Sequence, residues 1–273
     1  MLLTVVGTGL IGGSFALGAR TRNLFQSFVG VDPDADNARS ALSLGIVDEI
    51  AEEVPPASDA VLIAAPSDAV AGWVTRLADH PGVLFDAGSV KGAILDGISD
   101  QLGAVPERFV PCHPIAGREL SGPGAANEDL FADRLVVQTP LAGTDPEARE
   151  QVAYWWRSLG ARVESMDPEL HDRVYALTSH LPHLIAFAYM QQIEPAHLDH
   201  AGGGFRDFSR IGGSDPDMWS AIFGLNKEAV LGALAGFEAD LAGLREAIEA
   251  EDQDAVRAYI ARASGRRRGY LGD

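Results

Sequence analysis

Leu2-Leu3-Thr4-Val5-Val6-Gly7-Thr8-Gly9-Leu10-Ile11-Gly12 is the stretch of sequence that decides the fold. Its apolar first half predicts a buried strand, its second half satisfies the pattern G-x-G-x-x-G, and a helical segment follows over residues 13–20. In such a unit the first glycine permits a tight turn, the second lets a pyrophosphate approach the backbone, and the third lets the helix pack against the strand. We therefore predict a dinucleotide-binding α/β domain. The residues expected to contact the cofactor are Gly7, Gly9, Leu10, Ile11 and Gly12.

An acidic residue follows the second predicted strand. Asp32 comes directly after the run Phe28–Val31 and 20 residues after Gly12. A carboxylate at this place accepts hydrogen bonds from ribose hydroxyls and repels a 2′-phosphate, so the predicted cofactor is NAD rather than NADP. The alternatives left open are that Asp32 only caps the following turn, that the nucleotide is FAD, or that the domain is a catalytically silent sensor of the nucleotide.

The first part of the chain alternates apolar runs with helical segments, which predicts a doubly wound, mostly parallel sheet covered by helices on both faces. The predicted strands are residues 2–6, 28–31, 61–65, 83–86, 109–111, 135–139 and 161–165. The pattern changes after Met166, where Asp167-Pro168 is typical of a helix start and no further strand is predicted. We predict a Rossmann-type domain over residues 1–166 and an all-helical domain over residues 167–273.

One predicted helix carries a continuous apolar stripe. Its positions are spaced alternately four and three residues apart, as on one helix face. They are Val230, Leu234, Phe237, Leu241, Leu244 and Ile248. Because the helical part is too short to bury several such helices alone, the stripe predicts a homodimer; the alternative is that it faces only its own chain.

Composition excludes several partners. The formal net charge of −18 repels nucleic acid and anionic membranes, and no run approaches the roughly 20 apolar residues of a membrane span. The single cysteine, Cys112, permits neither an intrachain disulfide nor a cysteine-based zinc cluster. This cysteine usage, and the absence of a signal-peptide pattern in the first residues, fit a cytoplasmic protein.

A histidine is the candidate catalytic base. His113 follows the apolar run Phe109–Val110 and is therefore expected beyond the carboxyl end of a strand, where open α/β sheets bind ligands. Its ordinary pKa near ~6.5 suits it to accept a hydroxyl proton during hydride transfer. Ser89, in the segment Asp86–Lys91 after another strand, is placed to hydrogen-bond the base and fix its tautomer. The plainer interpretations are a turn histidine bonded to backbone and a serine that caps the next helix.

Two segments of the helical part are candidates for substrate contact. Ser179-His180-Leu181-Pro182-His183 places two histidines three residues apart, which suits substrate contact or helix packing better than a zinc site, because zinc needs more ligands. The segment Gly202–Arg210 reads as a flexible loop whose arginines are able to clamp a carboxylate, or else as a surface loop with an ion pair. We predict no metal site.

Taken in order, these segments resemble the prephenate/arogenate dehydrogenase family of tyrosine biosynthesis. The resemblance covers nearly the whole chain, and its most specific parts are the histidine-proline and glycine-arginine segments. The matching segments are Gly7–Ser14, Asp86–Lys91, His113–Gly117 with Glu119, Ser121 and Gly122, Ser179–His183, Gly202–Arg210, Ser214–Pro216 and Met218–Trp219.

The resemblance implies NAD-dependent oxidative decarboxylation of prephenate, in which hydride leaves C4, the C4 hydroxyl loses its proton and the ring carboxylate departs as CO₂. It implies that His113 is the base and that Ser89 orients the hydroxyl near the nicotinamide. The substrate-binding residues that it implies are Arg210, His183, Ser179, Gly203 and Trp219, with Glu119 and Asp207 in an ionic network with Arg210. It also implies a Rossmann domain followed by a helical dimerisation domain.

Some alternatives stay open. Arogenate differs from prephenate only in an amino group in place of a keto group, and the sequence does not choose between them. Arg118 and Gly213 depart from the family pattern, which puts substrate detail in doubt, and Arg118 either adds positive charge at the pocket mouth or points to solvent. A β-hydroxyacid dehydrogenase is disfavoured because Lys227, the only lysine after residue 166, has the wrong surroundings for that class. A nucleotide sensor has no use for His113, Ser89 and Arg210 together.

Overall fold

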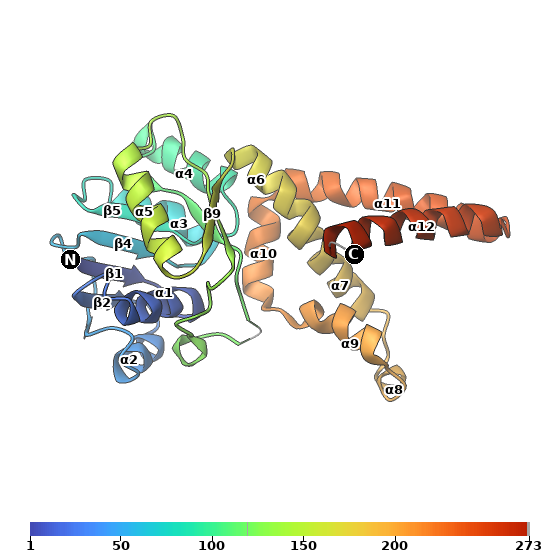
Figure 1. Cartoon of the computed structure of the whole chain (residues 1–273), viewed down its shortest axis with the longest axis horizontal. Coiled ribbons are helices and arrows are strands. Elements are labelled where there is room, and N and C mark those ends of the chain that lie inside the picture. Colours follow the sequence, from blue (N-terminus) through green and yellow to red (C-terminus); the bar gives the residue numbers. More distant parts are fainter. Residues whose placement is uncertain (119, 272–273) are drawn as a thin grey trace. The chain divides into compact units, whose positions relative to one another are not determined.

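The computed structural model describes residues 1–118 and 120–271. Its centre is a six-stranded, wholly parallel sheet in the order β3-β2-β1-β4-β5-β6 (Figure 1). The strands are β1 (Leu2–Val6), β2 (Ser27–Val31), β3 (Glu49–Ile50), β4 (Ala60–Ile63), β5 (Val83–Asp86) and β6 (Phe109–Val110). The strand order reverses between β1 and β4, and in open sheets the crevice at such a switch point binds the ligand.

Helices cover both faces of this sheet, which confirms the predicted doubly wound domain. They are α1 (Leu10–Thr21), α2 (Ala35–Ser43), α3 (Ser67–Arg76), α4 (Gly92–Leu102) and α5 (Pro146–Ser158). Neighbouring residues of β1 face opposite ways: Val5 joins a core with Phe15 of α1 and Trp156 of α5, and Val6 joins another with Val74 of α3. Burial on both faces explains why these strands are almost wholly apolar in sequence.

A second, three-stranded sheet corrects the prediction of a single sheet. It consists of β7 (Cys112–Pro114), β8 (Leu135–Gln138) and β9 (Arg162–Ser165), with β7 antiparallel to β8 and β8 parallel to β9. The short strands β3 and β7 were not predicted, and Pro111 was assigned to the strand before it. Because proline has no N–H for a ladder, Pro111 ends β6, and the chain starts a new strand at Cys112.

Helices follow Met166, and no strand occurs among the residues described beyond it, as predicted. These helices are α6 (Pro168–Tyr175), the π-helix η2 (Ala176–His180), α7 (Leu181–Met190), α8 (Pro195–Leu198), α9 (Gly203–Ser209), the 3₁₀ helix η3 (Arg210–Gly213) and α10 (Pro216–Leu225); a further short 3₁₀ helix, η1, spans Pro123–Ala125. Asp167 caps α6 by accepting hydrogen bonds from the N–H groups of Glu169 and Leu170, as the Asp-Pro pair predicted.

The segment Gly202–Arg210 is not the predicted loop but helix α9 and the first residue of η3. Its glycines lie at the helix start, where they cost little, and its aromatic side chains hold the helix in place. Phe205 and Phe208 both pack against Tyr189 of α7, with ring centroids 6.1 and 5.3 Å away.

The chain divides into two compact units, Met1–Lys227 and Glu228–Asp273. This division differs from the change in secondary structure after Met166, so the domain boundary at 166/167 stays a prediction. The second unit consists of α11 (Lys227–Glu249), apart from its first residue, and α12 (Gln253–Leu271). No helix in the described ranges is both long and apolar enough to span a membrane.

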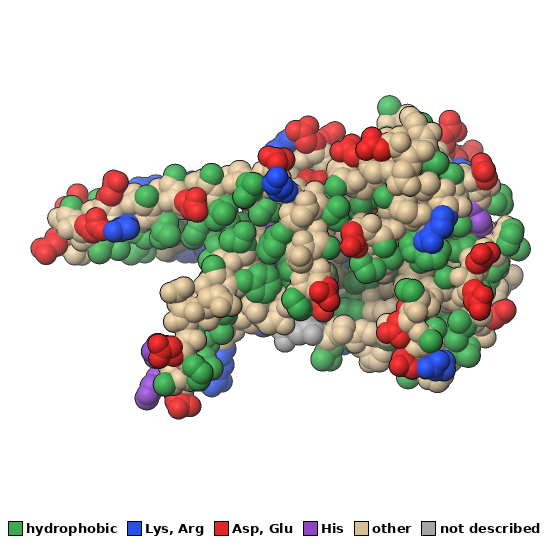
Figure 2. Space-filling view, turned by 180° about the vertical axis from the view of Figure 1, so that it is seen from behind, with side chains coloured by type: hydrophobic (Ala, Val, Ile, Leu, Met, Phe, Trp, Pro, Cys, Tyr) green, Lys and Arg blue, Asp and Glu red, His purple; other side chains and the backbone are tan. Residues whose placement is uncertain are grey.

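Helix α11 contains the predicted apolar stripe. Two of its members are largely exposed within one chain: Leu241 by 52% and Ile248 by 59%. Figure 2 shows hydrophobic side chains gathered along this helical pair. Such a stripe on a helix surface is typical of a face that another helix covers.

Candidate active site

The glycine turn between β1 and α1 has the geometry of a phosphate-binding turn. Gly7 has a φ of +87°, and a Cβ on it would lie 2.5 Å from the carbonyl oxygen of Ala64. A Cβ on Gly12 would lie 2.0 Å from the carbonyl oxygen of Gly7, whereas a Cβ on Gly9 would meet no atom within 4 Å. Gly9 is the N-cap of α1 and supplies no capping side chain, so the helix start remains open to an anion.

Asp32 lies beside this turn. The backbone N–H and the hydroxyl of Thr8 both donate to its Oδ2, each at 2.8 Å, and the N–H of Asp34 donates to Oδ1 at 3.0 Å. Asp32 therefore fastens the glycine turn to the end of β2 and also caps the following turn. Its half-buried carboxylate keeps further acceptor capacity, and its contact with a ribose stays a prediction.

A buried ion pair fixes the main chain next to His113. Lys91 Nζ donates to Asp86 Oδ2 at 2.5 Å and to the carbonyl oxygen of Cys112 at 2.7 Å, and both ion-pair side chains are fully buried. Asp86 Oδ1 accepts from the N–H of Cys112 at 2.8 Å. Both polar groups of the Cys112 backbone are thus held, which positions the next residue, His113, at the carboxyl end of the sheet.

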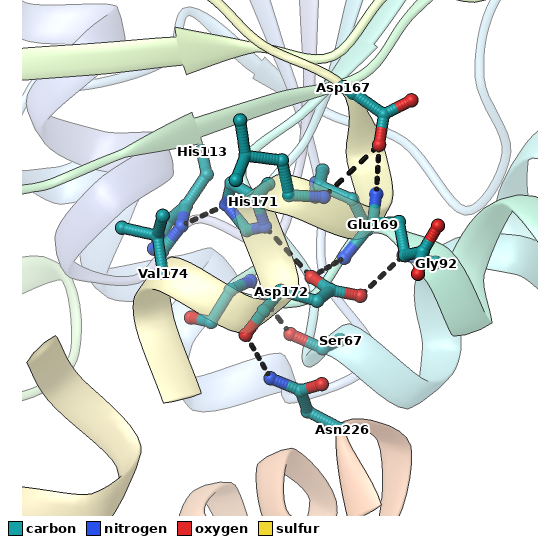
Figure 3. Close-up of polar contacts among 12 residues, drawn as sticks. Ser67, Gly92, His113, Asp167, Glu169, His171, Asp172, Val174 and Asn226 are labelled. Atoms are coloured by element: carbon teal, nitrogen blue, oxygen red, sulfur yellow. Dashed lines mark hydrogen bonds and ion pairs between the residues drawn. The ribbon is translucent and has the colours of Figure 1, made fainter. Parts of the chain in front are cut away.

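His113 begins a chain of hydrogen bonds that sequence analysis did not find (Figure 3). Its Nδ1 lies 2.8 Å from Nε2 of His171, and Nδ1 of His171 lies 2.8 Å from Oδ1 of Asp172. The carboxylate of Asp172 in turn accepts from the backbone N–H groups of Lys91, at 2.9 Å, and Gly92, at 2.8 Å. Asp172 therefore caps helix α4 from a distant part of the sequence.

The surroundings of these groups shift their pKa values in a consistent direction. Burial, together with the positive potential of His171, Lys91 and His180, holds the pKa of His113 well below its usual value, so its imidazole is neutral at pH 7. Burial also lowers the pKa of His171, although Asp172 opposes this shift.

The carboxyl group of Asp172 shows the opposite balance. Burial acts to raise the pKa of Asp172, but the hydrogen bonds from His171 and from the backbone of Lys91 and Gly92 outweigh it, so the pKa is lowered and the group is ionised.

A second cluster surrounds Trp219 of α10. The ring of His183 stacks on Trp219 with centroids 3.7 Å apart, and the ring of His180 meets it edge-on at 5.9 Å. His180 Nδ1 lies 3.1 Å from Nδ2 of Asn226, which also donates to the carbonyl oxygen of Asp172 at 2.9 Å. His180 ends the π-helix η2, a type of helix that often marks functional sites.

The predicted substrate residues are only partly brought together. His183 Nδ1 donates to the carbonyl oxygen of Ser179 at 2.8 Å, and Arg210 is close enough to help lower the pKa of His183, after the larger effect of burial. Gly203 and Asp207 lie on the exposed surface of α9. Glu119 lies outside the described residues, so the predicted ionic network stays a prediction.

Ser89 neither caps helix α4 nor makes the hydrogen bond to Nδ1 of His113. Helix α4 starts at Gly92, so Ser89 is not its cap, and the cap hydrogen bonds come from Asp172. The contact to Nδ1 of His113 is made by His171. Ser89 is half-buried, with its N–H bonded to Ser67 Oγ at 3.0 Å, and its contact with the substrate hydroxyl stays a prediction.

Arg118 has an exposed side chain. It lines a pocket of about 390 Å³ together with Asn127, Asp129 and Arg134, among other residues. Both alternatives for Arg118, charge at the mouth of the substrate pocket or a side chain in solvent, stay predictions.

The residues missed by sequence analysis lie on the inner faces of helices. His171, Asp172 and Tyr175 are buried on α6 at a spacing that one helix face requires. A histidine and a carboxylate on the apolar face of a helix would have been the signal for them. Asn226, which ties Asp172 to His180, gives no comparable signal in the sequence.

Two family models match successive parts of the chain. The family model for the nucleotide-binding domain of prephenate dehydrogenase matches residues 15–165, and the model for its dimerization domain matches residues 167–262. The chain is 36% identical to the cyclohexadienyl dehydrogenase of Zymomonas mobilis, over 92% of this chain and 90% of that protein.

Solved structures agree. The prephenate dehydrogenase of A. aeolicus, determined in complex with hydroxyphenyl propionate and NAD⁺, is 34% identical with a TM-score of 0.91, over 99% of this chain and 98% of that one. The arogenate dehydrogenase of Synechocystis is 28% identical with a TM-score of 0.82, over 99% of this chain and 100% of that one. Since the matches extend through both parts of the chain, this protein belongs to the prephenate dehydrogenase family.

Proposed function

We propose that this protein is an NAD-dependent prephenate dehydrogenase, which converts prephenate and NAD⁺ into 4-hydroxyphenylpyruvate, CO₂ and NADH. The observation that carries the proposal is the position of His113. Its imidazole follows β6 at the carboxyl end of a dinucleotide-binding sheet, and its surroundings keep it neutral. A neutral imidazole at this edge is ready to accept a proton from an alcohol that loses hydride to a nucleotide.

The glycine turn and Asp32 fit NAD. The N-terminus of α1 and the open side of Gly9 suit a pyrophosphate, with Leu10, Ile11 and Gly12 forming the first turn of the helix. Asp32 accepts hydrogen bonds from ribose hydroxyls and disfavours a 2′-phosphate. When bound, NAD⁺ accepts the hydride that leaves C4 of the substrate.

In the remaining steps the proton of the C4 hydroxyl passes to His113 and later returns to the same oxygen. As hydride leaves C4, the O–H bond of the C4 hydroxyl breaks, its proton passes to His113 and its electron pair forms the C=O bond. The bond from the ring to the carboxylate then breaks and its electrons make the ring aromatic, so that the oxygen takes the proton back as a phenol. His113 therefore acts first as base and then as acid, and Ser89 orients the hydroxyl.

The residues of the helical part hold the substrate. Arg210 supplies positive charge for a carboxylate, as an acidic protein with an anionic substrate must do locally. His183 and Ser179 line the site beside Trp219, whose buried indole N–H has no acceptor among the described residues. Gly203 and Asp207 border it from α9.

We also propose that the enzyme is a homodimer in the cytoplasm. The match to a dimerization domain and the two exposed members of the α11 stripe, Leu241 and Ile248, support the dimer. A partner chain that covers this stripe would remove apolar area from water.

The test is a measurement of NADH formation by the purified protein with NAD⁺ and either prephenate or arogenate, repeated with NADP⁺. We expect turnover of prephenate with NAD⁺ and little with NADP⁺. The His113→Asn variant should lose about 10²- to 10⁴-fold in kcat, the usual contribution of a general base. His200→Asn, which changes an exposed histidine, is the matched control and should leave kcat unchanged.

Each other outcome contradicts a part of the proposal. Turnover of arogenate alone would correct the substrate. Unchanged kcat in His113→Asn would remove this residue as the base. No turnover of either substrate by a protein that binds NAD⁺ would leave a nucleotide sensor or a hydroxyacid dehydrogenase.

A further inference from the structure

With His171 neutral, as its lowered pKa favours, the hydrogen-bond chain that ends at Asp172 has one direction. The N–H groups of Lys91 and Gly92 are obligatory donors, so the Asp172 carboxylate must accept at both oxygens. With Oδ1 an acceptor, Nδ1 of His171 donates to it. The Nε2 atom of a neutral His171 then carries the lone pair, and Nδ1 of His113 must donate to it. Nε2 of His113 is left as the unprotonated nitrogen.

We infer that His171 and Asp172 are positioning residues that hold His113 as the Nδ1–H tautomer, with Nε2 as the atom that takes the substrate proton. The inference rests on the proposed function for the identity of that proton. It goes beyond that function because it says that two residues of α6 determine which nitrogen of His113 accepts the proton.

The anchoring of Asp172 supports this role. Its carboxylate is bonded to the start of α4 and its carbonyl oxygen to Asn226, so it is held from two elements besides its own. His171 is fully buried and packs against the ring of Tyr175, with centroids 4.5 Å apart. Figure 3 shows His171 between His113 and Asp172, joined to each by a hydrogen bond.

The chain also moderates the charge that appears on His113 during the reaction. Lys91 and His180 disfavour the protonated form of His113, and the ring of Tyr175 lies beside it with centroids 4.8 Å apart. Asp172, with a smaller contribution from Asp86, opposes them by favouring the protonated form of His171. After His113 accepts a proton at Nε2, its Nδ1 proton is able to shift toward His171, which brings the positive charge next to the carboxylate.

A matched pair of substitutions separates positioning from packing. Phenylalanine at position 171 fills the same ring space but cannot accept from His113, whereas glutamine offers both an N–H group that donates and a carbonyl oxygen that accepts. We expect kcat of His171→Phe to fall about 10²-fold, which is the lower end of the contribution that a general base makes to the rate. KM should change less than about threefold. His171→Gln should recover most of that loss at equal thermal stability.

Removal of the charge gives a second readout. Because the Asp172 anion favours the protonated form of the histidine pair, Asp172→Asn lowers the pKa of that pair. The acid limb of kcat/KM should therefore shift to lower pH while its plateau falls. Asp167→Ala, which removes the cap of the same helix without touching the chain, is the control and should keep both the plateau and the limb.

The tautomer itself is measurable without turnover. Ring ¹⁵N chemical shifts of His113 at pH 7, assigned by their loss in His113→Asn, should show Nδ1 protonated and Nε2 bare. The opposite tautomer would overturn the inference. An active wild type together with an unchanged kcat in His171→Phe would also overturn it. An inactive wild-type protein with the expected tautomer would instead refute the proposed function and leave the hydrogen-bond direction standing.

Discussion

Lys91 joins two segments that meet beside His113. Its ammonium group is fully buried against Asp86 and the carbonyl oxygen of Cys112. Replacing it by methionine preserves volume but leaves a buried carboxylate without its ion-pair partner, which should reduce the free energy of unfolding by about 3–5 kcal/mol. Urea denaturation measures this loss. Arg157→Met breaks an exposed ion pair and should change stability by less than about 0.5 kcal/mol; similar losses in both variants would contradict the argument.

His180 makes stability depend on pH. Burial lowers its pKa to about 4, from 6.5 in the unfolded chain. The unfolded state therefore binds a proton that the folded state does not in the range between these values, and stability is lost as pH falls below 6.5. From pH 7 to pH 5 this loss should be about 2 kcal/mol for His180 alone.

Urea denaturation of wild type and His180→Asn at both pH values tests this. The variant should be less stable at pH 7 because it loses contacts with Trp219 and Asn226. Its stability should nevertheless change less between the two pH values. Equal pH dependence in the two proteins would show that His180 is not the titrating group.

The site could be predicted from sequence where a residue follows a strand, and not where it lies on a helix. Asp32 comes directly after an apolar run and His113 three residues after Val110, and parallel strands bring such positions to one edge. His171 and Asp172 reach the same place only through the packing of α6, 58 residues after His113. Sequence spacing carries no information on that packing. For the same reason no role was predicted for Lys91, the last residue of the segment Asp86–Lys91.

At the scale of the element, the β1–α1 turn separates two kinds of glycine. Gly12 lies where a Cβ would overlap the carbonyl oxygen of Gly7, whereas Gly9 faces open space. Gly12→Ala should destabilise the protein by about 1–3 kcal/mol through overpacking. Gly9→Ala should keep the stability within about 1 kcal/mol and raise the Kd for NADH by at least about tenfold, since its methyl group projects toward the pyrophosphate.

Thermal unfolding and fluorescence titration with NADH check the two variants. Each serves as the control for the other. Unchanged NADH affinity in a stable Gly9→Ala protein would mean that the phosphates do not lie over the start of α1.

Element prediction failed where tertiary contacts decide the outcome. Strand β3 has two residues and β7 three, too few for any periodicity to appear. Helix α9 was assigned as a loop because two glycines begin it and a third, Gly202, precedes it, and its packing against Tyr189 overrides that local preference. The long strands and the Asp167-Pro168 helix start were correct because their signals are local.

At the scale of the whole molecule, the stripe on α11 predicts the state of assembly. Leu241→Glu places a charge in an apolar face and should convert a dimer into a monomer at micromolar concentration. Light scattering coupled to size-exclusion chromatography measures the mass. Ala239→Glu adds the same charge to an exposed position two residues away, on another side of the helix, and should remain dimeric. A monomeric wild type would contradict the dimer and would mean that the stripe faces only its own chain.

The fold of the first part was predicted correctly because the glycine motif and the alternation of strands and helices both specify it. The second sheet was missed, since nothing in the sequence of β8 or β9 says which neighbour it pairs with. Pairing partners are decided by packing, as they are for the hydrogen-bond chain of the site.

The cap that Asp172 places on helix α4 has a consequence for evolution. Because the contact is made to backbone N–H groups, most substitutions at the capped end leave the donors intact. Gly92 is the exception: a Cβ there would lie 2.9 Å from Asp172 Oδ2. Among relatives, a side chain at position 92 should therefore be tolerated only where position 172 has lost its carboxylate, and a saturation library should show the two positions varying together although they are 80 residues apart.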